Sequence, residues 1–259
     1  MPHKMNNAKT VEYQLMLGRE VTEAIRSFPA GYLPVGCLER HGDHLPMGLD
    51  VIKAHLVCCA VAKAVGGVVF PPHYYAGIHK MSDAQIAKYT GEWGNIYTDR
   101  TAKDNLEDII HQIAITGVKV LVLYSGHYPG CQIDMIKEVG ANAANQASIT
   151  VIPFSEIMIM KGDHAGISET SFMLYLNKDL VDMTRITEVN YQDHGWQKEN
   201  APEKASVRKG AMDVAAVIAH LKDKIEDAMS RQSKPMASNK TNSDDALQRT
   251  RPASLGEKK

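Results

Sequence analysis

Residues 119–124 read Lys-Val-Leu-Val-Leu-Tyr, an almost uniformly apolar run that restricts the possible folds of this chain more than any other segment. Strands of a parallel sheet covered on both faces have this character, because neither side meets water. Similar apolar runs predict further strands, and amphipathic runs with helical spacing alternate with them. This alternation predicts one three-layer α/β/α domain built on a mostly parallel sheet. The predicted strands are Leu33–Leu38, Gly67–Phe70, Lys119–Tyr124 and Ile149–Phe154, and the predicted helices are Val51–Ala64, Ala102–Gly117 and segments near 130–145, 167–177 and 210–230.

The predicted domain spans residues 1–231. From Gln232 onward the chain is polar and offers little that could pack into a core, so residues 232–259 are predicted to form a disordered tail. Residues 71–95 are predicted to be an irregular segment that shapes a substrate pocket. Its candidate pocket residues are His73, Tyr74, Tyr75, His79, Tyr89 and Trp93.

Charge and composition exclude several classes of function. A formal net charge of −1 over 259 residues gives no electrostatic footprint for nucleic acid or for an anionic membrane. Residues 1–20 lack the apolar region of a secretory signal, and Lys63 interrupts the longest apolar candidate for a membrane span. The cysteines lack a zinc-ribbon spacing, which indicates reduced thiols in a cytoplasmic protein. They are Cys37, Cys58, Cys59 and Cys131.

Residues 39–50, Glu-Arg-His-Gly-Asp-His-Leu-Pro-Met-Gly-Leu-Asp, concentrate potential metal ligands in one short run. If the preceding apolar run is a strand, Glu39 and His41 project from one face at its end. Carboxylate and imidazole groups together favour Zn²⁺ or Mn²⁺, which indicates a metallohydrolase. Asp50 is either a further ligand or only the N-cap of the predicted helix that follows it. His44 is either a ligand or a hydrogen-bonded loop histidine.

A second motif, Ser-Gly-His-Tyr-Pro-Gly at residues 125–130, follows the apolar run 119–124. Ligand crevices of parallel α/β sheets lie beyond the carboxyl ends of the strands, so His127 is expected at the same edge as Glu39 and His41. The neighbouring glycines allow the backbone to approach a bound ion closely, which favours ligation by His127. Ser125 lacks the Gly-x-Ser-x-Gly context of a hydrolase nucleophile, so a serine triad has little support.

A third motif, Gly-Asp-His-Ala-Gly-Ile-Ser-Glu-Thr-Ser at residues 162–171, leads into an apolar segment. One interpretation makes it a helix N-terminus, with Ser168 as the cap and Glu169 stabilised by the helix dipole. The other interpretation assigns Glu169 to a metal centre and makes His164 a proton carrier. The spacing of the motif does not choose between them.

Together the three motifs resemble the creatininase (creatinine amidohydrolase) family. The family pattern is Glu-x-His-Gly-x-His-Leu-Pro-x-Gly-x-Asp, then a Gly-His loop after a core strand, then His-Ala-Gly-x-x-Glu-Thr-Ser, and all three parts occur here in order. The resemblance implies an α/β/α hydrolase of small molecules that forms homo-oligomers, often hexamers. It also implies one or two divalent ions, Zn²⁺ or Mn²⁺, per subunit.

The resemblance also implies roles for individual residues. Matching positions in the first two motifs are metal ligands in the family, with Asp50 as the bridge between ions. Glu169 matches an acidic residue that is a ligand or a close neighbour of one. His164 matches the catalytic acid/base, and Tyr128 is a candidate for substrate binding. The ligands implied in the first two motifs are Glu39, His41, Asp50 and His127.

Two departures from creatininase affect the expected substrate. Creatininase has a glutamate two residues after the loop histidine, where this chain has Pro129, so Glu169 or water is expected to complete the site. Creatininase also covers creatinine with tryptophans before the catalytic histidine, and residues 154–163 contain none. The expected reaction is therefore attack by metal-activated water on a carbonyl of some small cyclic amide.

Three other functions are considered. The same apparatus could cleave a C–C bond beside a ketone in a cyclic polyol, as in diketo-inositol hydrolases of this family. A non-catalytic metal-binding subunit could share the fold. A nucleotide-binding α/β protein has little support, because Gly36, Gly42 and Gly48 form neither a GxGxxG nor a P-loop spacing.

Overall fold

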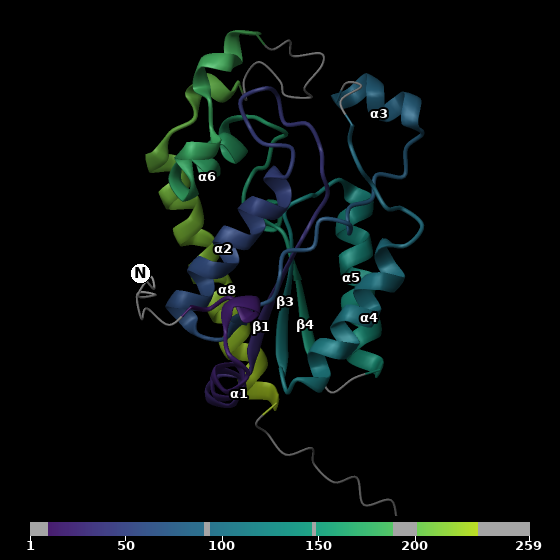
Figure 1. The fold of residues 1–259 in the computed structure, drawn as a ribbon, viewed down its shortest axis with the longest axis vertical. Helices are drawn as coiled ribbons and strands as arrows, with labels where there is room; N and C mark the ends of the chain where they lie inside the picture. The colour runs from purple at the N-terminus through teal and green to yellow at the C-terminus, as the bar shows by residue number, and fades with distance from the viewer. Residues whose placement is uncertain (1–9, 91–93, 147–148, 189–200, 233–259) are drawn as a thin grey trace, which may run out of the picture.

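A four-stranded parallel sheet lies at the centre of the computed structural model, which describes residues 10–90, 94–146, 149–188 and 201–232 (Figure 1). The strands run in the order β2-β1-β3-β4. The register of β1 with β3 pairs Ala30 with Val120 and Val35 with Ser125, so both strands end at one level. The strands are β1 (Ala30–Val35), β2 (Val68–Val69), β3 (Val120–Ser125) and β4 (Thr150–Phe154).

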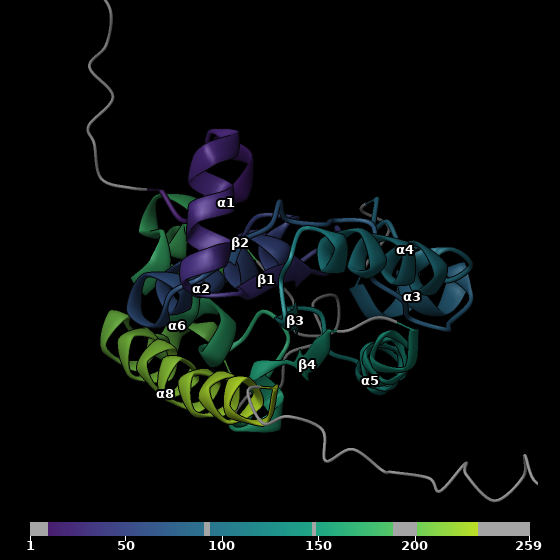
Figure 2. The ribbon, with the colours of Figure 1, turned by 90° about the horizontal axis from the view of Figure 1, so that it is seen from below.

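Helices cover both faces of this sheet and complete the predicted three layers (Figures 1 and 2). On one face α2 packs against β1 and α8, and α6 packs against α8. On the other face α5 packs against β4 and α4, while α1 lies near β2 at the edge of the sheet. The helices are α1 (Gly18–Ser27), α2 (Leu49–Val65), α3 (Asp83–Thr90), α4 (Ala102–Ile115), α5 (Gly130–Gln146), α6 (Ile167–Leu176) and α8 (Val207–Gln232), with short 3₁₀ turns at Tyr13–Leu15, Glu156–Met158, Lys178–Leu180, Met183–Glu188 and Pro202–Lys204.

Alternate side chains of β1 and β3 enter the two layers, because successive residues of a strand point to opposite faces. Both layers are apolar, which explains why these strands read as continuous apolar runs. The predicted α/β/α fold is therefore confirmed. Leu33, Val35, Leu121 and Leu123 face α4 and α5, whereas Tyr32, Val120, Val122 and Tyr124 face α2 and α8.

The predicted boundaries of the first strand are wrong. The strand begins at Ala30 and ends at Val35, so Glu39 and His41 lie on the loop after it and not at its end. Beyond Val35 the backbone leaves the ladder to β3, and Gly36 donates its N–H to the carbonyl oxygen of His73 at 3.2 Å. The two side chains are brought together by this loop and not by strand alternation.

A helix interrupts the segment that was predicted to be irregular. Residues Asp83–Thr90 form α3, preceded by a Ser-x-x-Gln capping arrangement. The amide of Ser82 donates to Oε1 of Gln85 at 3.0 Å, and the amide of Gln85 donates to Oγ of Ser82 at 3.4 Å. This cap is a recognisable start signal in the sequence, and it stabilises a helix with little apolar periodicity.

The C-terminal end of the described chain differs by one residue from the expectation. Gln232 is the last residue of α8, and its Nε2 donates to the carbonyl oxygen of Lys119 and to Oγ1 of Thr150, both at 2.8 Å. Residues 233–259 lie outside the described residues, so the tail stays a prediction. None of the helices that the structure describes is long and apolar enough to cross a membrane.

Candidate metal centre

Five segments meet beyond the carboxyl ends of β1 and β3 and form the wall of one cavity. They are the loop after β1, the first turn of α2, the segment between β2 and α3, the loop after β3, and the segment that leads into and includes the first turn of α6. The cavity has a volume of about 700 Å³ and contains every predicted ligand together with the predicted acid/base. The residues that line it include Glu39, His41, Asp50, His79, His127, Tyr128, Lys161, Asp163, His164 and Glu169.

Gly126 brings the loop after β3 against the first turn of α2. A Cβ atom at this position would lie 1.9 Å from the carbonyl oxygen of Asp50, which is far inside any allowed contact. Only glycine therefore permits this approach. The next residue, His127, is placed directly beside the Asp50 side chain as a result.

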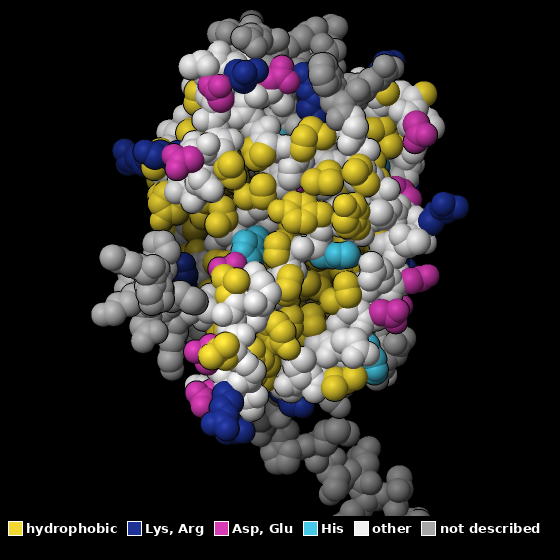
Figure 3. Space-filling model, in the orientation of Figure 1, with side chains coloured by type: hydrophobic (Ala, Val, Ile, Leu, Met, Phe, Trp, Pro, Cys, Tyr) yellow, Lys and Arg dark blue, Asp and Glu magenta, His cyan; other side chains and the backbone are white. Residues whose placement is uncertain are grey.

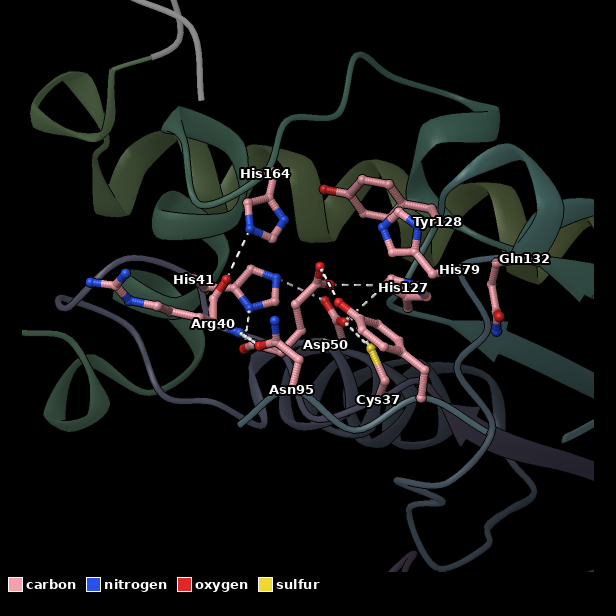
Figure 4. A network of polar contacts seen from close by, with 12 residues as sticks. Cys37, Arg40, His41, Asp50, His79, Asn95, His127, Tyr128, Gln132 and His164 are labelled. Carbon is pink, nitrogen blue, oxygen red and sulfur yellow. Dashed lines mark hydrogen bonds and ion pairs between the residues drawn. The ribbon is translucent and has the colours of Figure 1, made fainter. Parts of the chain in front are cut away.

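The His127 ring lies between a backbone carbonyl and two carboxylates (Figure 4). Its Nε2 lies 3.2 Å from the carbonyl oxygen of Ile78, which can only accept, so Nε2 carries a hydrogen. Its Nδ1 lies 3.2 Å from Oε2 of Glu39 and 3.3 Å from Oδ2 of Asp50. In the neutral ring Nδ1 therefore carries a lone pair, and this lone pair faces two negatively charged oxygens.

His41 repeats this arrangement with the opposite ring nitrogen. Its Nδ1 donates to the carbonyl oxygen of Glu39 at 2.9 Å. Its Nε2 lies 3.2 Å from Oδ1 of Asp50 and 3.6 Å from Oε2 of Glu169. Asp50 therefore directs one carboxylate oxygen to each histidine. It is shared by two groups of candidate ligands, one around His127 and one around His41, as a bridging ligand would be.

Charge and spacing show that these residues fit divalent ions. Two ligand atoms about 2.0–2.2 Å from one tetrahedral ion lie about 3.3–3.6 Å apart, close to the separations found here. Without an ion the positive charge comes from the imidazoles. Burial favours the neutral ring, yet Asp50 and Glu169 outweigh it and raise the pKa of His41 to about 9. A cation at each group supplies the same compensation.

His164 lies over the His41 ring, with centroids 4.4 Å apart, and faces the cavity (Figure 4). Its Nε2 donates to the carbonyl oxygen of Arg40 at 2.9 Å, so the neutral ring has its basic lone pair on Nδ1. Burial, and then the charge of His41, lowers the pKa of His164. The ring is therefore held in the neutral form that can accept a proton near neutral pH.

Glu169 is fixed by three donors. Nζ of Lys53 and the hydroxyl of Tyr128 each lie 2.8 Å from its Oε1, and the amide of Ala165 donates to its Oε2 at 2.7 Å. Ala165 has a φ of 53°, a left-handed conformation that is strained for a residue other than glycine. This strained turn follows His164 directly, so it fixes the ring and the carboxylate relative to each other.

Comparison with known proteins agrees with this geometry. The sequence model of the creatininase family, described as creatinine amidohydrolase, matches residues 14–233. The chain belongs to the creatininase family. It is therefore a metal-dependent hydrolase of that family.

Related proteins of known name span most of this creatininase-family chain. Creatinine amidohydrolase of Pseudomonas putida is 29% identical over 183 residues, which are 60% of this chain and 67% of that protein. A crystal structure of creatinine amidohydrolase (creatininase) has 25% identity and a TM-score of 0.69, over 85% of this chain and 98% of that chain. A structure named "Creatininase Mn" covers the same shares with 25% identity and a TM-score of 0.67.

Sequence reasoning missed two side chains of this creatininase-family site. Lys53 is fully buried and pairs with Glu156 at 2.5 Å as well as with Glu169. It stands one helical turn after Asp50, and a lysine within the apolar run of α2 is the signal that could have revealed it. The hydroxyl of Tyr97, just beyond the segment predicted to shape the pocket, donates to Oε1 of Glu39 at 2.8 Å.

The remaining predicted residues differ in whether they line the cavity. Nε2 of His44 lies 2.9 Å from Oγ1 of Thr170, and the histidine does not line the cavity, which favours the interpretation as a hydrogen-bonded loop residue. Tyr128 does line the cavity. Among the candidate pocket residues whose side chains the structure describes, His79 alone lines it; the side chain of Tyr89 and all of Trp93 lie outside the description.

Neither Asp50 nor Ser168 is the N-cap of its helix, although the third motif does begin a helix with Glu169 in its first turn. Helix α2 begins at Leu49 with Gly48 as its N-cap, so Asp50 lies inside the first turn. Helix α6 has Gly166 as its N-cap, and the carboxylate of Asp163 accepts the amide hydrogen of Ser168 at 2.7 Å. Neither Asp50 nor Glu169 is an N-cap residue, so their carboxylates are available as metal ligands.

Proposed function

We propose that this chain hydrolyses the C–N bond of a small cyclic amide with two divalent ions, Zn²⁺ or Mn²⁺, in the cavity. The observation that carries the proposal is the shared carboxylate of Asp50. Its two oxygens face two histidine nitrogens, each of which also faces a second carboxylate. The names of the related creatininases support the reaction and the metals.

The proposed ligands form two groups that share Asp50. Glu39, Asp50 and His127 would hold one ion, and His41, Asp50 and Glu169 would hold the other. When bound, the ions polarise the substrate carbonyl and lower the pKa of a water. One ring nitrogen of His41 and one of His127 each donate a hydrogen bond to a backbone carbonyl oxygen. These hydrogen bonds keep both rings oriented for metal binding.

His164 carries the proton in the proposed reaction. Nδ1 of the neutral ring takes a proton from the attacking water, and the ring then gives that proton to the leaving nitrogen as the C–N bond breaks. The Arg40 carbonyl oxygen holds the ring in the tautomer that this requires. Tyr128 and Lys161 line the same cavity and are proposed to contact the substrate.

A second substrate class has a specific observation in its favour. The described residues that line the cavity combine Lys161, Asp163 and Tyr128 and include no tryptophan. Such a lining suits a hydroxyl-rich ring better than a flat heterocycle, which favours C–C hydrolysis of a cyclic diketo-polyol as the alternative reaction.

A substrate panel with the metal-loaded enzyme tests the proposal. Creatinine, hydantoin and dihydrouracil represent cyclic amides, and a diketo-inositol represents the alternative. We expect ring opening of a cyclic amide that is lost on chelation and restored by Zn²⁺ or Mn²⁺. Turnover of the diketo-inositol alone would establish the alternative, and bound metal with no turnover of any compound would identify a non-catalytic subunit.

We also propose that the protein is a cytoplasmic homo-oligomer, with a hexamer as the family resemblance implies. Large apolar side chains support assembly, since Leu17, Ile115 and Met212 are each more than 60% exposed. Apolar side chains also gather across the middle of the face in Figure 3. The four free cysteines support a reducing compartment. Sedimentation velocity tests the assembly, and a monomer at micromolar concentration would contradict it.

A further inference from the structure

Cys37 lies against the metal centre without lining its cavity. The residue is fully buried between β1 and Glu39. Its Sγ lies 3.3 Å from Oδ2 of Asp50 and 3.9 Å from Oε2 of Glu39 (Figure 4). These are the same two oxygens that face Nδ1 of His127. The thiol therefore approaches this group from the side away from the substrate.

Four separations among these donor atoms lie within about 0.4 Å of those in a four-coordinate zinc site. Zinc bonds of about 2.0 Å to nitrogen or oxygen and 2.3 Å to sulfur place tetrahedral ligands about 3.3 Å apart for N and O and about 3.5 Å apart for S and O. The measured values are 3.2 and 3.3 Å for Nδ1 of His127, and 3.3 and 3.9 Å for Sγ. All four donor atoms lie within 4.8 Å of one another.

The other group is different in composition and in access. His41, Asp50 and Glu169 supply only nitrogen and oxygen, and no cysteine joins them among the residues that the structure describes. All three residues line the cavity, and the ring of His164 lies beside that of His41. Three protein ligands leave a position for water, whereas four close a zinc site.

We propose that Cys37 is the fourth ligand of the ion held by Glu39, Asp50 and His127. This ion then has a closed set of one sulfur, one nitrogen and two oxygens, and the thiolate selects zinc over manganese. The ion at His41, Asp50 and Glu169 keeps the open position and exchanges more readily. On binding, the ion replaces the thiol hydrogen and the proton leaves to solvent. The inference rests on the proposed metal centre and assigns different roles to its two ions.

Cobalt substitution of the enzyme tests this assignment. Co²⁺ bound to a thiolate gives a near-ultraviolet charge-transfer band, whereas Co²⁺ bound only to nitrogen and oxygen gives visible d–d bands without it. The experiment uses a Cys59→Ala background, because Cys59 is the other thiol near a histidine and a carboxylate. We expect the charge-transfer band in this protein and its loss in Cys37→Ala. The matched control is Cys58→Ala, since Cys58 is equally buried but points from α2 into the apolar core, and this variant is expected to keep the band.

Metal competition gives a second readout. Cys37→Ala is expected to weaken the tighter zinc site by about 10–100-fold and to reduce its preference for zinc over manganese. If Cys37→Ala does not fold, zinc X-ray absorption of the Cys59→Ala protein replaces it, with one sulfur neighbour expected for half of the zinc.

Each other outcome has a definite meaning. Bound cobalt with d–d bands but no charge-transfer band, or zinc without a sulfur neighbour, overturns the role of Cys37 and leaves the proposed function intact. If the wild-type cluster binds no metal at all, the proposed function fails as well.

Discussion

Within the part of the chain that the structure describes, two clusters combine cysteine, histidine and carboxylate side chains, and they differ in how those groups meet. In the metal centre, His41 and His127 each face two carboxylates at 3.2–3.6 Å. In the second cluster, Nε2 of His55 faces one carboxylate, that of Glu12, at 2.9 Å, with Sγ of Cys59 at 3.8 Å. Residue types alone therefore do not distinguish the two clusters.

The two clusters differ in the number of carboxylates around each histidine and in how exposed their side chains are to water. The ligand carboxylates of the metal centre are at most 2% exposed, so their mutual repulsion is hardly screened. The side chains of His55 and Glu12 are 16% and 28% exposed, and one hydrogen bond accounts for their contact. Glu12 forms a parallel bridge to Val69, so this pair ties the N-terminal segment at the sheet edge to α2. An excess of buried negative charge marks the functional cluster, whereas a balanced pair marks a structural one.

The largest expected effect comes from removing the shared charge. Asp50→Asn preserves shape but removes the carboxylate that both groups use, so both ions are expected to be lost. Activity should fall on the order of 10³-fold or more, since each ion supplies several kcal/mol to the transition state. Metal content after dialysis and kcat/KM of the reconstituted enzyme measure this. The matched variant Glu12→Gln should retain both, and equal metal loss in the two variants would erase the distinction.

Replacing His164 should separate catalysis from metal binding. His164→Ala is expected to retain the ions while kcat falls by about 10²–10⁴-fold, because the proton carrier is lost and the ligands are not. His55→Ala is the control in the second cluster and should leave kcat unchanged. Metal analysis measures the bound ions, and steady-state kinetics measures kcat. An unchanged kcat in His164→Ala would show that His164 is not the acid/base.

Lys53 tests how strongly the buried charges depend on compensation. Lys53→Met leaves Glu156 and Glu169 without their shared cation and is expected to lower the free energy of unfolding by about 3–5 kcal/mol. Lys63→Met changes an exposed lysine on the same helix and should have almost no effect. Urea denaturation at saturating zinc measures both, and similar midpoints would show that Lys53 is dispensable.

The smallest expected effect belongs to the second cluster. Glu12→Gln should lower the free energy of unfolding by less than about 1 kcal/mol, because a partly exposed pair contributes little. The same denaturation curves, recorded with and without added zinc, provide the measurement. A strong zinc-dependent stabilisation of wild type that disappears in Glu12→Gln would instead make this cluster a metal site.

Most of the fold could be predicted from the sequence because β1 and β3 are buried on both faces and helices such as α4 and α8 are amphipathic. The sequence predicted Glu39, His41, Asp50, His127, His164 and Glu169 because they lie in three motifs that the fold brings to one sheet edge. It did not predict the end of β1, since the pairing with β3 that sets this end joins residues distant in the chain.

A lysine within the apolar run of α2 is a signal in the sequence, but the partners of Lys53 could not be predicted from it. Its partners, Glu156 and Glu169, are more than 100 residues away, so no local pattern connects them. The same holds for Tyr97, which reaches Glu39 across 58 positions. Local motifs reveal ligands that lie next to each other in sequence, whereas the residues that compensate their charge depend on tertiary packing.

A crystal structure of the zinc-loaded protein, with anomalous data at the zinc edge, tests the central claim most directly. We expect two peaks in the cavity on either side of the Asp50 carboxylate, one beside His127 and one beside His41. Absence of zinc from both positions, or zinc only at Glu12, His55 and Cys59, would contradict it.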